Sequence, residues 1–454
     1  MATEKDKTLT AKKGEEGDLK EIWISSNEGG KSVNISPATT QFYYYESILD
    51  NTIRVTLRFV DTGNTIQLED GLSVIEGLPI VGTERVDIVI EDANEEKVEV
   101  TLYVNTVTPI SESTQNNTVD MTLVSKEFFV NENGKTRVVN RFDGLISKHI
   151  KKVLTEEKYL ATDKDVSDIE ETSNSYNCWG RNLKPFAFTN WIQQKGIPSE
   201  GTNTGGFFLW ETSKGFHFRS VDGLMSQDPK LKLIYNNIQD VRGENIPPEY
   251  DGQILDLQGS NNINVKEKLE LGSYVSRIVL FDPFNCKYEI VKPTAKKKSS
   301  GGGREKPKKM EPKMAGKELP PDVFNKEIDF DFTRTTYMLW DSGTLPTGNT
   351  NQQIEKSKEH NLKPEETFNQ SKMRYNQMFT IQRSITIPGD FTLQAGDAIF
   401  IDVPEVSDKK DKDINQQVGG LYIIVDLCHY MSGVPPACFT RLNLTRDSYK
   451  RKPA

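Results

Sequence analysis

The chain has 454 residues, of which 35% are hydrophobic and 27% charged, and its mean hydropathy is −0.58. This length leaves room for about two to four domains, and the polar composition is typical of β-rich proteins with long loops. The longest apolar runs fall far short of the roughly 20 residues that cross a bilayer. The charged stretch from Ala2 to Glu21 excludes a secretory signal.

The charge is segregated along the chain. Between Lys296 and Lys317, nine Lys or Arg and two Glu give +7, and since the whole chain has a formal charge of −9, the remainder has −16. An acidic body argues against a protein that grips nucleic acid. The basic stretch lacks interleaved aromatic residues and therefore predicts a solvated linker.

Residues 1–20 are predicted to form a flexible arm, and residues 21–137 a first β-barrel domain. The segment Thr52–Phe59 alternates strictly between apolar and polar residues, as in a half-buried strand. Similar strands are predicted at Val86–Ile90, Val98–Val104 and Val119–Val130. Together they predict an antiparallel meander with one wet face, closed or nearly closed into a barrel.

Residues 138–228 are predicted to form a central α/β module. Apolar residues at helical spacing predict a helix over Phe142–Leu154, and a second helix from Pro185 to Gly196. The strand Phe207–Trp210 is apolar on both sides, and a turn leads to the return strand Phe216–Arg219. Three of the five tryptophans lie in or beside this stretch, which predicts a packed core; they are Trp179, Trp191 and Trp210.

Residues 229–446 are predicted to form a second β-barrel domain, followed by a C-terminal tail over 447–454. Its Lys-, Gly-, Pro- and Ser-rich segment 292–321 can form no core and is predicted to be a flexible insertion. A helix is expected over Pro364–Phe379. The expected strands are Tyr274–Phe281, Lys287–Val291, Thr380–Ile387, Ala398–Val403, Leu421–Leu427 and Phe439–Leu444.

An internal repeat would relate the two predicted barrels. Leu102-Tyr103-Val104 resembles Leu421-Tyr422-Ile423, and each is followed by a turn and a strand of similar character. The spacing is 23 positions from Tyr103 to Lys126 and 24 from Tyr422 to Arg446. Either the halves are repeats of one tube-type domain, or two unrelated β-hairpins show this much likeness by chance.

The sequence contains no convincing catalytic, cofactor-binding or metal-binding residues. Gly29-Gly30-Lys31-Ser32 lacks the first glycine and the following helix of a phosphate-binding loop, which favours a surface turn. Cys428 and His429 are adjacent in a strand and so point to opposite faces; we expect a buried thiol and an outward imidazole. His149 is expected to be a satisfied histidine at the edge of the core.

Two other polar patterns favour structural roles. His217, Arg219, Ser220 and Asp222 form a polar constellation, but solvated residues on the outer face of a strand explain it better. The four cysteines lie far apart without metal-ligand spacing, which predicts reduced thiols in a protein made in a cytoplasm; they are Cys178, Cys286, Cys428 and Cys438.

Several short motifs, in the order barrel, helix-containing module and second barrel, resemble a known family. They are Lys184-Pro185-Phe186, Asn190-Trp191-Ile192, Gly206–Thr212, Gly215–Phe218, Tyr375–Phe379, Ile385–Gly389, Leu393–Asp397 and Gly420–Ile424. Over roughly residues 40 to 446 the chain resembles the central baseplate hub protein of T-even-like contractile-tailed phages. That family is related to the hub part of type VI secretion spike proteins.

The resemblance implies a structural virion protein of the tail baseplate, assembled in the host cytoplasm, and not an enzyme. Family hubs are homotrimers whose paired barrels form a pseudo-sixfold ring between a trimeric spike and a hexameric tail tube. Expected partners are therefore the spike protein, which can bear a lysozyme activity, the tail tube and tube-initiator proteins, and the tape-measure protein. DNA is expected to pass through the channel without specific binding, past lumen-facing residues enriched in Asp, Glu, Asn, Thr and Ser.

Two alternatives belong to other classes. A carbohydrate-active or carbohydrate-binding β-rich protein would show an exposed row of tryptophans and paired carboxylates in a cleft. A secretion-system spike hub would have a needle domain on the same chain, whereas this sequence reaches Ala454 without a repetitive β-helix.

Replacing Lys296–Lys317 with a short Gly-Ser linker is expected to leave the melting temperature of the body nearly unchanged. The segment's composition cannot support a packed core, and loop-closure entropy depends only weakly on loop length. Differential scanning calorimetry of both forms measures this. A large drop would show that the segment is docked and structural.

Overall fold

The fold is described from a computed structural model of the chain. The described residues are 17–27, 30–62, 74–78, 80–112, 116–200, 205–235, 253–261, 265–271, 276–283, 286–291, 334–345, 348–362, 364, 367–403, 415, 418–433 and 436–447. The predicted insertion 292–321 lies outside these residues, as do most of the arm and of the tail. Within the described residues, no helix has both the length and the apolar character to span a bilayer.

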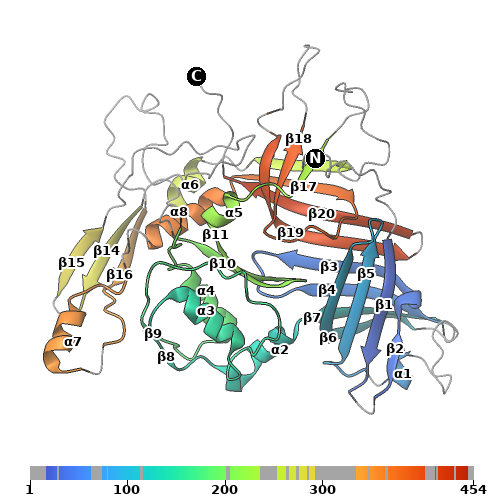
Figure 1. The fold of residues 1–454 in the computed structure, drawn as a ribbon, viewed down its shortest axis with the longest axis horizontal. Helices are drawn as coiled ribbons and strands as arrows, with labels where there is room; N and C mark the ends of the chain where they lie inside the picture. Colours follow the sequence, from blue (N-terminus) through green and yellow to red (C-terminus); the bar gives the residue numbers. More distant parts are fainter. Residues whose placement is uncertain are drawn as a thin grey trace, which may run out of the picture.

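The dominant element is one sheet of 13 strands, seen as the blue and red strands of Figure 1. Its order is β13-β17-β20-β19-β3-β4-β7-β6-β5-β1-β2, with β18 beside β19 and β12 beside β18. The first-half strands are β1 (Gly17–Ser25), β2 (Ser32–Asn34), β3 (Thr39–Ser47), β4 (Arg54–Asp61), β5 (Arg85–Asp92), β6 (Lys97–Glu112) and β7 (Asn117–Val124). The second-half strands are β12 (Leu231–Ile234), β13 (Asp256–Asn261), β17 (Ile381–Pro388), β18 (Ala398–Asp402), β19 (Gly420–Gly433) and β20 (Pro436–Arg446).

The two halves are joined edge to edge by β3 and β19, which pair antiparallel from Ser47↔Asp426 to Gln41↔Ser432. The strand order of the described residues is an open path, and no closed barrel is detected. The prediction of two barrels, each closed or nearly closed, is therefore not confirmed: the described strands of both halves form one continuous sheet. Alternation predicts strands with one wet face, but it does not determine which edges meet.

The hairpins β6–β7 and β19–β20 support the internal repeat. In one, Val104 pairs with Leu123 and a bulge follows; in the other, Ile424 pairs with Leu444 and a bulge follows at the same place. The equivalent of Tyr103 is thus Ile423, one position after the Tyr422 that the sequence suggested.

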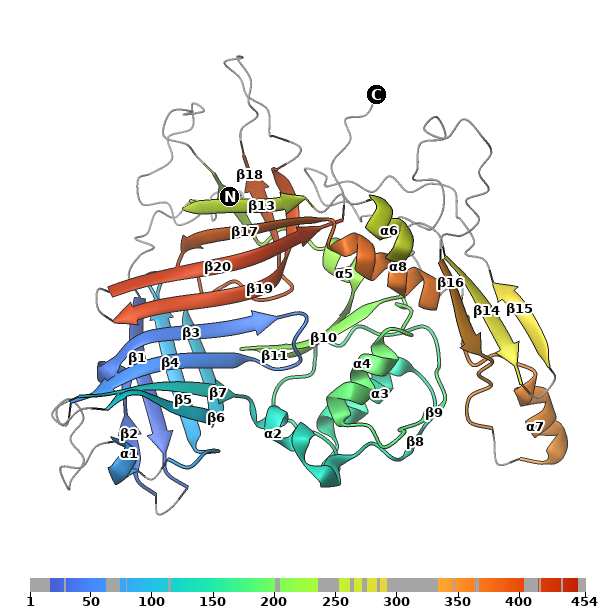
Figure 2. The ribbon, with the colours of Figure 1, turned by 180° about the vertical axis from the view of Figure 1, so that it is seen from behind.

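The central module lies beside the large sheet and has its own hydrophobic core, as Figures 1 and 2 show from opposite sides. Helix α4 (Pro185–Gln193) packs on the hairpin β10 (Phe207–Thr212) and β11 (Gly215–Ser220), as the sequence predicted. Every residue of β10 is buried. Trp210 is buried, but Trp179 is exposed, so the expectation of three core tryptophans is wrong for Trp179.

The remaining elements surround these two cores. They are α1 (Val74–Gly77), α2 (Lys126–Glu132), β8 (Arg141–Phe142), α3 (Ile146–Thr155), β9 (Cys178–Trp179), α5 (Val221–Met225), α6 (Val265–Leu271), β14 (Ser276–Asp282), β15 (Lys287–Val291), β16 (Arg334–Leu339), α7 (Thr350–Ser357) and α8 (Phe368–Met378), with 3-10 turns at Ser36–Ala38 and Gly134–Thr136. Three boundaries differ from expectation: β1 already begins at Gly17, β7 ends at Val124 before α2, and Asp447 is buried.

A buried ion pair fastens α8 to the rest of the fold. The Arg374 guanidinium donates from Nε to Asp222 Oδ1 at 2.9 Å and from Nη1 to Asp447 Oδ2 at 3.1 Å. All three side chains are almost inaccessible to solvent. The pair thus connects α5, α8 and the residue that follows β20.

Replacing Arg374 with alanine is expected to destabilise the chain by about 3–5 kcal/mol, because two carboxylates lose their buried partner. The matched control is Arg85→Ala, whose guanidinium is exposed beside Asp87 and whose loss should cost less than about 1 kcal/mol. Urea denaturation followed by circular dichroism measures both. Equal effects for the two variants would contradict this role of Arg374.

Candidate functional site

The largest candidate surface is the polar face of the continuous sheet, opposite the main hydrophobic core. Directly paired residues share a face, so the register defines rows that run across the strands. One row contains Thr106, Thr122, Thr56, Tyr43 and Tyr430. The next rows contain Arg54, Tyr45, Cys428, Arg441, Thr386 and Asp256, and then Ser47, Asp426, Asn443, Ser384 and Gln258. The rows cross the β3–β19 junction without interruption, which makes this face a single surface.

The charges on this face are few and balanced. Over the described strands from β13 to the second half of β6, they are Arg54, Arg58, Arg441, Asp120, Asp256 and Asp426. Lysine and glutamate are absent from the same described strands of this face. Hydroxyl and amide side chains therefore dominate this face, its three arginines balance its three aspartates, and the acidic excess of the chain lies elsewhere.

The arginines of this face have local partners. Arg58 Nε and Nη2 donate to the two carboxylate oxygens of Asp120 at 2.7 and 3.0 Å. The Arg54 guanidinium lies 5.1 Å from the centre of the Tyr45 ring. Since both groups are engaged within the sheet, they are less available to bind phosphates.

The orientation of Cys428 and His429 is the reverse of the expectation. His429 is buried, its Nδ1 lies 2.9 Å from Thr440 Oγ1, and burial lowers its pKa to about 3. Cys428 lies half-buried on the polar face beside Tyr45. The bulge after Ile424 shifts the alternation by one residue, which explains the reversal.

A shallow cavity of about 480 Å³ opens on the same face near the β3–β4 turn. Its walls include Leu49, Gln258, Gln382, Ser384, Asp426 and Asn443. The lining mixes apolar side chains with amide and hydroxyl groups, and Asp426 is its one carboxylate among the described residues, so no pair of carboxylates is placed there for acid–base catalysis. In the part of the chain that the structure describes, no three metal-ligating side chains are grouped together either.

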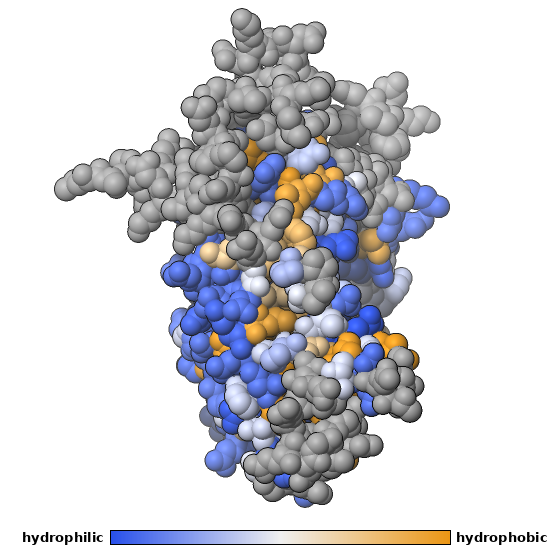
Figure 3. Space-filling view, turned by 90° about the vertical axis from the view of Figure 1, so that its right-hand side faces the viewer, coloured by the Kyte–Doolittle hydropathy of each residue, from blue (hydrophilic) through white to orange (hydrophobic). Residues whose placement is uncertain are grey.

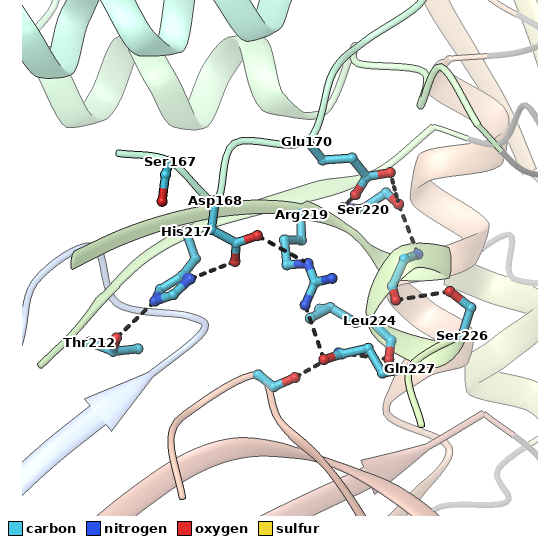
Figure 4. A network of polar contacts seen from close by, with 12 residues as sticks. Ser167, Asp168, Glu170, Thr212, His217, Arg219, Ser220, Leu224, Ser226 and Gln227 are labelled. Atoms are coloured by element: carbon cyan, nitrogen blue, oxygen red, sulfur yellow. Dashed lines mark hydrogen bonds and ion pairs between the residues drawn. The ribbon is translucent and has the colours of Figure 1, made fainter. Parts of the chain in front are cut away.

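A hydroxyl–imidazole–carboxylate arrangement occurs in the central module (Figure 4). Asp168 Oδ2 lies 2.6 Å from His217 Nδ1, and His217 Nε2 lies 2.8 Å from Thr212 Oγ1. This is the order of groups in a hydrolytic triad. However, Thr212 is 2% exposed and its oxygen also accepts from the Lys214 amide, so no substrate can reach it. The arrangement stabilises the β10–β11 turn.

The rest of this network is also structural, and it corrects the prediction of solvated residues. His217 stacks on Trp210 with 5.3 Å between ring centres and is only 16% exposed at its side chain. Ser220 donates to Glu170, and Arg219 donates to Gln227 at 3.0 Å. The loop from Asp165 to Glu170 runs along β11 and covers these side chains, which the sequence pattern could not show. By contrast, His149 is buried with its Nε2 2.8 Å from the Tyr176 carbonyl oxygen, as predicted.

Lys195 is a buried lysine in an aromatic cage that the sequence did not predict. Lys195 Nζ lies 3.9 Å from the centre of the Trp191 ring and 4.5 Å from that of Tyr176, and it donates to the Tyr176 hydroxyl at 3.1 Å. Phe368 of α8 completes the cage. Burial lowers the pKa of Lys195 to about 8, with only partial compensation by Asp341. No periodic signal marks such a residue, because its partners come from three separate segments.

Comparisons with known proteins give only weak similarity, with TM-scores below 0.5, to solved structures that include tail proteins. No protein-family model matches the chain, and neither does any curated protein. Two similar solved structures are the tail protein from Neisseria meningitidis MC58 (8% identity, TM-score 0.49, covering 94% of this chain and 96% of that one) and the prophage MuSo2 43 kDa tail protein from Shewanella oneidensis (9% identity, TM-score 0.49, 94% and 98%). An E. coli component of the type VI secretion system is similar at 8% identity and a TM-score of 0.42, over 96% and 80% of the two chains. These values are too low for function to be transferred to this chain.

Lys195 is expected to make stability depend on pH. Its folded pKa of about 8 lies below the ordinary 10.5, so between these values the unfolded chain binds more protons than the folded chain. The free energy of unfolding should therefore rise from pH 8 towards 10.5, while below pH 8 the cost of protonating the buried amine is fully present. Urea denaturation across this range should show a smaller rise for Lys195→Met than for the wild type. If the free energy of unfolding rises equally in the wild type and in Lys195→Met, burial in the cage does not lower the pKa of Lys195.

Proposed function

We propose that this chain is a structural hub of a contractile phage tail baseplate. Three copies would form a ring that adapts a trimeric spike to a hexameric tail tube and encloses a channel for DNA and the tape-measure protein. The motifs from Lys184 to Ile424 that resemble the hub family support this proposal. The hub is not an enzyme, and any peptidoglycan-cleaving activity belongs to the spike protein.

The observation that favours this function most is the repeated hairpin within one continuous sheet. A ring that joins threefold and sixfold partners needs two similar surfaces per chain, so that three chains present six. The hairpins β6–β7 and β19–β20 have this relation, including the bulge at the equivalent position. A monomeric enzyme or a carbohydrate-binding module has no need of such a repeat.

The polar face is the surface best suited to line the channel. Hydroxyl and amide groups dominate it, lysine is absent from its described strands, and Arg58 is paired with Asp120. Each basic group that neutralises a phosphate favours binding by releasing counterions, so a wall with few available cations lets DNA slide. A neutral face with paired charges therefore binds phosphates weakly, even though the face is not acidic.

The exterior also suits a protein built into an assembly. On the side of the molecule shown in Figure 3, hydrophobic residues interrupt the hydrophilic surface in several patches. Exposed apolar side chains among the described residues include Trp23, Ile110 and Tyr337. Contact with neighbouring subunits or baseplate proteins would remove such groups from water.

Multi-angle light scattering tests the ring. We expect three hub chains per particle: about three times the 51.4 kDa of the monomer for the concentrated protein alone, and that mass plus the mass of the bound spike for its mixture with the cognate spike protein. A stable complex of one hub chain with one spike chain would contradict the proposed function. A carbohydrate-binding module would instead remain monomeric in both samples.

A further inference from the structure

The second half of β6 has an outer edge that no described strand covers. β5 pairs with β6 only from Lys97 to Tyr103, whereas β7 pairs with its other side as far as Glu112. Thr106, Thr108, Pro109 and Ile110 are exposed, and Ile110 is 50% accessible. Exposed backbone along a strand edge is a template for pairing with another strand.

The equivalent segment of β19 is covered, and its partner is β3. Counted from the bulge that both hairpins share, Leu427 of β19 occupies the position of Val107 of β6, and His429 occupies the position of Pro109. Leu427 and His429 are each 1% exposed, because β3 lies against this part of β19. Among the described strands, the second half of β6 thus has no neighbour in the position that β3 occupies beside β19.

The strand equivalent to β3 in the second half is β13. β3 lies beside β4, and β13 lies beside β17, at the same position in the two strand orders. Tyr44 pairs with Val55, which pairs with Leu123 of β7. Gly259 pairs with Arg383, which pairs with Leu444, the residue of β20 equivalent to Leu123. Gly259 is therefore the equivalent of Tyr44. β13 ends the sheet in the described residues, and Gln258 and Gly259 are exposed, so its other edge is also uncovered.

We infer that β13 of one subunit pairs antiparallel with the second half of β6 in the next subunit, repeating the β3–β19 junction between chains. This inference rests on the proposed ring and specifies its seam. Since Tyr45 lies opposite Cys428 and Tyr44 opposite His429, the expected pairs are Ser260 with Thr108 and Gly259 with Pro109.

The seam has physical consequences that suit both strands. It gives hydrogen-bond partners to the edges of β6 and β13 that no other described strand covers, and it extends the rows of the polar face from one subunit to the next. It also brings β13 alongside the exposed Ile110. Pro109 has no amide hydrogen, so in its pair with Gly259 it takes part only as an acceptor, through its carbonyl oxygen. Because the seam joins two different edges, it is a head-to-tail contact and can close into a ring.

Disulfide cross-linking tests this register. Thr108→Cys and Ser260→Cys are combined in a chain whose accessible thiols are removed by Cys286→Ser and Cys428→Ser. Residues directly opposite in an antiparallel pair have Cα atoms about 4.5–5.5 Å apart, within disulfide range, whereas within one chain β17, β20, β19, β3, β4 and β7 lie between the two sites in the sheet. Oxidation should yield covalent trimers on a non-reducing gel, and each single-cysteine variant should not.

The matched control combines Thr122→Cys with Ser260→Cys. Thr122 lies on the same face next to Thr106 but one strand farther from the seam, roughly 10 Å from Ser260 in the expected pairing. The seam predicts at least about tenfold more cross-linked product for the first pair than for the control. Melting temperatures close to that of the parent establish that both variants are folded.

The outcomes separate the seam from the ring. Trimers in light scattering without selective cross-linking would overturn the seam and leave the ring intact. Monomers in all samples, without cross-linking, would contradict the proposed function as well. Hydrogen exchange of the wild-type chain gives an independent measurement: the amides of Val107 in β6 and Gly259 in β13, which occupy the positions of Leu427 and Tyr44, should become protected when the ring forms, and unchanged exchange would overturn the seam.

Discussion

The pairing of β3 with β19 is the interaction on which the rest of the structure depends. It joins residues nearly 400 positions apart, and Ser47 Oγ donates to Asp426 Oδ1 across it at 2.6 Å. Beneath it, the buried Glu46 carboxylate accepts from the amides of Ser213 at 3.0 Å and Ala395 at 2.9 Å. Burial raises the pKa of Glu46, and these bonds partly compensate. One short segment thus fixes both halves of the sheet and the central module relative to each other.

The central module is fastened to the first half by a second buried group. Glu211 of β10 accepts from the Ile53 amide and from the Ser125 hydroxyl, and it pairs with Lys164. Burial, with Glu127 nearby, raises the pKa of Glu211 to about 7 despite the opposing charge of Lys164. Buried polar groups of this kind are costly when unpaired, so they favour one arrangement of the units. A rigid connection suits a component whose proposed role is to transmit geometry between a spike and a tube.

Local pattern was sufficient to predict most elements but not their long-range partners. Strict alternation located β4, and helical spacing located α3 and α4, because these signals depend only on neighbouring residues. The β3–β19 pairing, the bulge that reverses Cys428 and His429, and the cage around Lys195 all depend on segments distant in sequence. The triad-like geometry of Asp168, His217 and Thr212 was missed for the same reason, and its burial shows why geometry alone does not establish catalysis. The boundaries of the three predicted domains stay predictions.

A cryo-electron microscopy reconstruction of the assembled ring tests the central claim most directly, namely that the polar face of the continuous sheet lines the channel. The account predicts that the side chains of Thr56, Thr122 and Ser384 surround the lumen, with Arg58 still paired to Asp120. A ring in which these side chains face the exterior, and another surface encloses the lumen, would contradict it.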